Sequence, residues 1–144
     1  MGFFSSLWDS LAGPDDVQSA VIEAVAATIF FDGEVSDEER GYAIGFVASM
    51  MEVDDAEADR YMEEGIGRIQ GRDFDDILRS IAERLPEFDQ RRMAFLASVG
   101  ASRAEGGFFS WGEEELLDAM ANHFGFSDHE REMITEQAEQ IMDA

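Results

Sequence analysis

Residues 30–40 of this chain read Phe-Phe-Asp-Gly-Glu-Val-Ser-Asp-Glu-Glu-Arg and stand between two strongly apolar helical patterns. Gly33 is suited to end the first helix, because glycine adopts the left-handed conformation common at helix C-termini. Ser36 and Glu39 have the spacing of a capping box, in which each side chain accepts a hydrogen bond from the other's backbone N–H group. The stretch therefore predicts a helix, a short acidic connection and a second helix.

The same helical periodicity runs along most of the chain. Apolar residues recur at helical spacing in segments 17–31, 43–51, 58–69, 74–85, 88–99, 116–124 and 134–141. Strand-like alternation bounded by turn residues is absent from the sequence, so we expect an all-α single domain of seven to eight helices. Segment 43–51 is apolar on nearly every side, which predicts that it forms the central helix.

Capping boxes also indicate an internal duplication. They occur at Ser36–Glu39, Asp54–Glu57, Ser110–Glu113 and Ser127–Glu130, with intervals of 18 and 17 residues within the two pairs. The apolar positions after the first box of each pair also correspond, with 44, 47, 48 and 51 matching 117, 120, 121 and 124. The pattern predicts two pseudo-symmetric helical halves.

Composition excludes several classes of function. The 144 residues contain no cysteine, which rules out disulfides, thiolate zinc sites and thiol nucleophiles. The net charge is −23, from 33 acidic and ten basic residues, and every basic residue is arginine. This charge repels nucleic acids and anionic membrane surfaces and favours cations and basic protein surfaces. Adaptation to a salt-rich cytoplasm explains the same composition, and the sequence leaves both explanations open.

Targeting signals are also lacking. The first residues carry no basic cluster of the secretory type, and no apolar run reaches 18 residues. We therefore expect a cytoplasmic protein.

Two regions of the chain resemble a known family. Residues 26–40 look like the Asp-Gly-x-apolar-Ser-x-x-Glu signature of the TerB-like family, named after a tellurite-resistance protein. The later region, residues 101–117, resembles the weaker second copy of that signature. This second copy departs from the pattern, because Glu105 or Gly106 stands where the aspartate is expected, which makes a second ion site doubtful.

The resemblance implies an all-helical domain over residues 14–144, linked to tellurite resistance and related stress responses. It further implies a module that binds divalent cations or a protein partner, including a membrane-associated partner, rather than an enzyme. By motif, Asp32, Glu34 and Glu39 are the expected metal ligands.

The residues themselves supply a physical argument for this site. Asp32 falls in the last turn of a predicted helix, where the helix dipole disfavours negative charge. Glu39 can fold back toward the same loop, and carboxylates gathered there would be stabilised by a hard cation such as calcium or magnesium. The alternative is purely structural: Glu39 is the capping partner of Ser36, while Asp37 and Glu38 suit a helix start. Asp32 alone is left without a structural explanation.

Catalytic chemistry is not indicated. His123 and His129 lack the preceding glutamates of di-iron helical bundles, and no serine has a recognisable histidine–acid partner. Gly106 and Gly107 are not part of a phosphate-binding loop, because the chain contains no lysine. We therefore expect a protein that is not an enzyme.

Aromatic residues suggest a second hypothesis. Segment 1–13 is a predicted amphipathic helix, and a second cluster follows the weaker motif; their aromatic residues are Phe3, Phe4, Trp8, Phe108, Phe109 and Trp111. These faces either pack onto the domain or dock onto a partner. The second reading predicts an interaction or assembly subunit that uses the N-terminal helix and the 105–111 loop and binds no specific ion.

Overall fold

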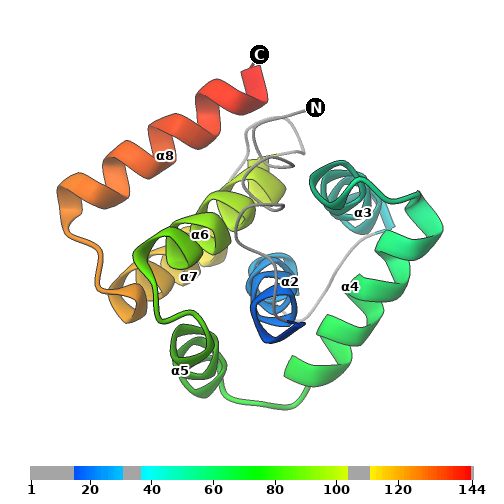
Figure 1. Ribbon diagram of the computed structural model, residues 1–144, viewed down its shortest axis with the longest axis horizontal. Helices are drawn as coiled ribbons and strands as arrows, with labels where there is room; N and C mark the ends of the chain where they lie inside the picture. The colour runs from blue at the N-terminus through cyan, green and yellow to red at the C-terminus, as the bar shows by residue number, and fades with distance from the viewer. Residues whose placement is uncertain (1–14, 31–36, 104–110, 144) are drawn as a thin grey trace.

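Seven α-helices make up the described part of this computed structural model, which comprises residues 15–30, 37–103 and 111–143 (Figure 1). They are α2 (Asp15–Phe30), α3 (Asp37–Met51), α4 (Asp55–Ile69), α5 (Phe74–Arg84), α6 (Phe88–Arg103), α7 (Trp111–Phe124) and α8 (Asp128–Asp143). No strand occurs within these ranges. The predicted all-α, single-domain fold is confirmed. None of the described helices is long and apolar enough to cross a lipid bilayer.

Local capping explains where the helices begin. The side chain of Asp54 accepts a hydrogen bond of 2.8 Å from the Glu57 N–H group at the start of α4. Ser127 and Glu130 form the complete reciprocal box at the start of α8, with bonds of 2.8 and 3.1 Å. α3 and α7 likewise start one residue after their predicted caps at positions 36 and 110. The capped starts of α4 and α8 are therefore confirmed, whereas the caps at positions 36 and 110 lie outside the described residues.

The central helix is α2, and the prediction that segment 43–51 holds this position is wrong. Val17 and all residues from 20 to 29 are buried, and α3, α4, α5, α6 and α7 all pack against α2. Figure 1 looks nearly along α2 and shows its neighbours arranged around it. In α3, by contrast, Gly41, Gly45 and Ser49 are exposed. These small residues recur every four positions, so they form a solvent-facing stripe that a hydropathy pattern does not reveal.

A close approach between α2 and α4 depends on one glycine. A Cβ atom at Gly65 would lie 2.9 Å from Cγ2 of Ile22, closer than carbon atoms pack. The absence of a side chain at position 65 therefore lets α4 pack directly on the central helix.

α3 and α7 end in the same way. The N–H group of Val53 donates to the Ala48 carbonyl, and that of Phe126 donates to the Ala121 carbonyl, both at 3.1 Å. Each is the characteristic bond of a Schellman motif, whose left-handed residue is Glu52 in α3 and glycine 125 in α7. The two ends correspond in the predicted duplication. The duplication itself stays a prediction, because α3 packs mainly on α4 whereas α7 packs mainly on α5 and α6.

Candidate functional site

The acidic segment connects the end of α2 to the start of α3. Asp32 and Glu34 lie outside the described residues. Glu39 is in the first turn of α3, but its side chain is also outside the described part. The set of Asp32, Glu34 and Glu39 as metal ligands therefore stays a prediction.

Arg40 follows the acidic segment in the sequence and forms ion pairs with α4. One of its terminal nitrogens lies 2.6 Å from Oδ1 of Asp59 and also bonds a carboxylate oxygen of Glu63. Hydrogen bonds and charge interactions with these two carboxylates raise the pKa of Arg40. The contacts tie the start of α3 to α4 and direct the guanidinium toward Asp59 and Glu63.

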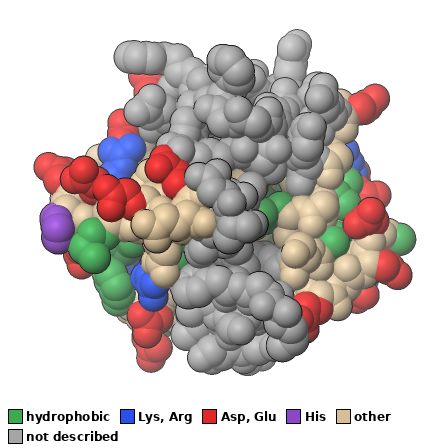
Figure 2. All heavy atoms as spheres, turned by 90° about the horizontal axis from the view of Figure 1, so that it is seen from above, with side chains coloured by type: hydrophobic (Ala, Val, Ile, Leu, Met, Phe, Trp, Pro, Cys, Tyr) green, Lys and Arg blue, Asp and Glu red, His purple; other side chains and the backbone are tan. Residues whose placement is uncertain are grey.

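Elsewhere on the described surface, acidic side chains are numerous but dispersed. Figure 2 shows them spread across the visible face with few arginines among them. Among the side chains that the structure describes, no three histidine or carboxylate groups gather as a metal site would require. This surface is electronegative without a defined ion-binding cage in its described part.

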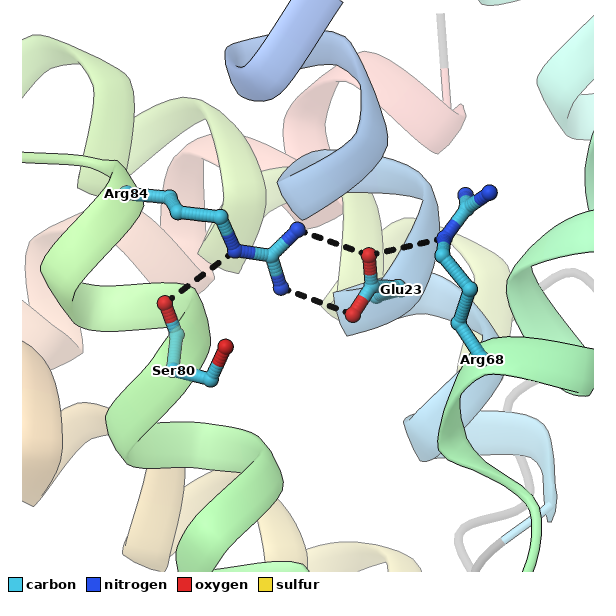
Figure 3. Close-up of polar contacts among 4 residues, drawn as sticks. All are labelled: Glu23, Arg68, Ser80 and Arg84. Atoms are coloured by element: carbon cyan, nitrogen blue, oxygen red, sulfur yellow. Dashed lines mark hydrogen bonds and ion pairs between the residues drawn. The ribbon is translucent and has the colours of Figure 1, made fainter.

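An ion-pair network around one buried carboxylate joins three helices, and it was not predicted from the sequence. Glu23 of α2 is only 2% exposed. Arg84 of α5 binds both of its carboxylate oxygens at 2.7 Å, and Nε of Arg68 from α4 lies 3.0 Å from Oε2 (Figure 3). Nε of Arg84 also donates to the Ser80 carbonyl, at 3.3 Å. The network joins α2, α4 and α5 through one carboxylate.

The two arginines stabilise the ionised form of Glu23. Burial by itself raises the pKa of Glu23, but hydrogen bonds and charge interactions with Arg84 and Arg68 lower it below the ordinary value. Both carboxylate oxygens accept guanidinium hydrogen bonds, which leaves Glu23 poorly suited to act as a base or ligand. Its role is to hold three helices together.

Sequence reasoning had one usable signal for this network. Glu23 is flanked on both sides by apolar residues of the most buried helix, where an unpaired carboxylate would be strongly unfavourable. Its partners stand 45 and 61 residues later in the chain. The sequence indicates that Glu23 needs a cationic partner, but it does not indicate which arginines bind it.

The predicted partner-binding residues cannot be placed. Phe3, Phe4, Trp8, Phe108 and Phe109 lie outside the described residues, and Trp111 begins α7 with a side chain that is also outside them. Docking through these aromatic clusters stays a prediction.

Comparisons with protein-family models, with curated proteins and with solved structures found no match. Membership of the TerB-like family therefore stays a prediction, made from the resemblance of residues 26–40 and of the weaker second copy.

Proposed function

We propose that this protein is a non-enzymatic, cation-responsive helical module that binds calcium or magnesium through Asp32, Glu34 and Glu39. The observation that supports it is the pairing of Arg40 with Asp59 and Glu63 on α4.

The argument is one of charge balance. Residues 32–39 contain five carboxylates, and the basic residue next to them in the sequence is Arg40. Because Arg40 binds two carboxylates of α4, its charge is already largely compensated. Repulsion within the acidic segment is then best relieved by a cation from solution, and oxygen-only ligands favour calcium or magnesium.

The surrounding helices would give such a site a firm frame. α2 is held by the core on all sides, and α3 is joined to α4 through Arg40. An ion that bridges residues 32 and 39 would connect the end of one fixed helix to the start of another. Ion binding would therefore be felt as a gain in the stability of the whole domain.

The resemblance to TerB-like proteins supports the proposal that this module acts in a tellurite-resistance-like stress system. A protein partner, including a membrane-associated one, is compatible with that role. Nucleic acid and anionic lipid are disfavoured as direct partners by the net charge of −23.

The test is thermal unfolding of the protein in high sodium chloride, titrated with calcium or magnesium. At an ion concentration of about 100 times Kd, binding adds about 2.7 kcal/mol to the free energy of unfolding. For a domain of this size, that gain raises Tm by roughly 8 °C. Asp32→Asn should abolish the shift, whereas the control Glu83→Gln, which removes one exposed charge from α5, should retain it. Equal shifts in all three proteins would mean general screening and would contradict the proposal.

A further inference from the structure

A groove lies between α6 and α8 and is separate from the acidic segment. Two large apolar side chains that line it are exposed to solvent. Its volume is about 600 Å³. Its lining residues are Phe88, Arg92, Glu130, Met133, Ile134, Glu136, Gln137 and Gln140.

The apolar side chains of this groove are open to solvent. Phe88 is 48% exposed and Met133 is 55% exposed. In the described part of the chain, these two are the exposed large hydrophobic residues, and both line the same groove. Ile134, which also lines the groove, is buried. Exposed apolar residues concentrated at one concave site are typical of an interaction surface.

The groove is also held in shape. The ring of Phe88 packs edge-to-face on Phe126, with ring centroids 5.6 Å apart, and Phe126 packs in the same way on Phe95 and Phe124. A hydrogen bond of 2.6 Å from Arg92 to Gln137 joins the two helices across the groove. A partner would therefore meet a largely formed surface and lose little free energy in ordering it.

α8 lies at the edge of the molecule (Figure 1). α8 runs along the outside of the molecule (Figure 1), and α6 is its main packing partner among the described helices. A third helix laid in the groove would contact both α6 and α8, which is the helix-in-groove mode of recognition.

Charge selects the kind of helix. α8 carries six carboxylates against one arginine. Glu130 and Glu136 line the groove together with one cation, Arg92, which is hydrogen-bonded to Gln137. A second copy of this chain, at net charge −23, would be repelled. The chain's own aromatic segment 1–13 contains one aspartate and no basic residue, so it lacks the complementary charge as well. The complementary occupant has apolar anchors and basic flanks.

We propose that the α6–α8 groove is a docking site for an amphipathic basic helix of a partner protein, with Phe88 and Met133 as the apolar contacts and Glu130 and Glu136 as the charged rim. The site is distinct from the proposed ion site and does not depend on it.

The test is fluorescence anisotropy of the full chain with a panel of labelled synthetic helices. Each peptide carries leucine or phenylalanine at positions i, i+4 and i+7 with lysine and arginine on both flanks. A matched panel replaces the basic residues with glutamate. Titrations are run at about 0.15 M salt. They contain EDTA, which removes divalent ions, so the measured binding does not depend on the proposed ion site. We expect the basic panel to bind and the acidic panel not to bind.

Variants locate the binding. Met133→Glu should raise the Kd about tenfold or more, as expected for loss of a central apolar contact. Ala56→Glu adds the same charge at an exposed position of α4 and should change the Kd by about twofold at most. Glu136→Gln should weaken binding and reduce its dependence on salt. Circular dichroism checks that each variant is folded.

Four results of the binding experiments would overturn the proposal. They are failure of the whole basic panel to bind, equal binding of the acidic panel, equal Kd values for Met133→Glu and Ala56→Glu, and tighter binding after Trp8→Ser. The last would show that the chain's own N-terminal segment occupies the groove. Sedimentation equilibrium serves as a further check, because a dimer disrupted by Met133→Glu would identify a second copy as the occupant and would equally contradict the proposal.

Discussion

Glu23 shows how one buried charge can specify the arrangement of three helices. Removing a carboxylate from water is costly, and the cost is offset only by well-placed hydrogen bonds. The bidentate contact with Arg84 supplies two such bonds, and Arg68 supplies a third from another helix. A shift of α4 or α5 along α2 would break these contacts, so the network favours one register among the three helices.

At the residue scale, Glu23→Gln should destabilise the protein at neutral pH by about 1–3 kcal/mol, because it removes charge-assisted hydrogen bonds to two partly exposed arginines. The folded-state pKa of Glu23 is lowered, so its contribution is complete above the unfolded pKa of about 4.5. That contribution is lost as the pH falls below 4.5 through the folded value. Urea unfolding at pH 7, 5, 4 and 3 should show the gap between wild type and variant closing with acid. Glu83→Gln is the control for a change in net charge, and a gap independent of pH would contradict this account.

At the element scale, two glycines of α4 have opposite roles. Gly65 is buried against α2, where a Cβ would meet Ile22 at 2.9 Å. Gly67 is exposed, and a Cβ there would meet nothing within 4 Å. The first glycine serves packing between helices, whereas the second only weakens its own helix.

Substitution by alanine should separate these roles. Gly65→Ala should lower the free energy of unfolding by about 1–3 kcal/mol, because α4 must move away from the stiff, β-branched side chain of Ile22. Gly67→Ala should raise it by about 1 kcal/mol, the difference in helix propensity. Urea denaturation of the two variants measures both effects. A stabilising Gly65→Ala would mean that α2 and α4 are less tightly packed than the structure indicates.

Arg91 connects elements in another way, at the ends of α5 and α7. Its guanidinium donates to the carbonyls of Ala82, Leu85 and Phe124 at 3.0, 2.6 and 3.2 Å. Helix C-termini leave carbonyl groups without partners, and a cation there also complements the helix dipole. One arginine thus completes two helix ends that are far apart in the sequence.

At the scale of the whole molecule, the net charge of −23 should make stability depend on salt. Ten arginines cannot compensate 33 acidic residues, so repulsion persists after the observed ion pairs form. Raising sodium chloride from about 0.01 to 1 M shortens the screening distance from roughly 30 to 3 Å. Tm, measured by calorimetry, should rise by roughly 5 °C or more over this range. A flat or falling Tm would show that the ion pairs, which salt weakens, dominate the electrostatics.

The sequence predicted the helical architecture well, because helix starts depend on residues three or four positions apart. The caps at Asp54 and Ser127 are visible as short motifs and form the expected bonds. It predicted the centre of the fold poorly. Segment 43–51 and α2 are both apolar, and only the packing shows that α3 turns Gly41, Gly45 and Ser49 to solvent.

For the sites as well, local features could be predicted from the sequence, and contacts between distant residues could not. The sequence alone determined the acidic segment, its excess of carboxylates over cations and the exclusion of cysteine chemistry, because composition and short spacing suffice for these. Only the tertiary structure decided where Arg40 directs its charge, which arginines neutralise Glu23, and that Phe88 and Met133 share one groove. Residues 88 and 133 lie on different helices. Contacts between residues so far apart in the sequence form only when the helices pack, and no short sequence pattern predicts them.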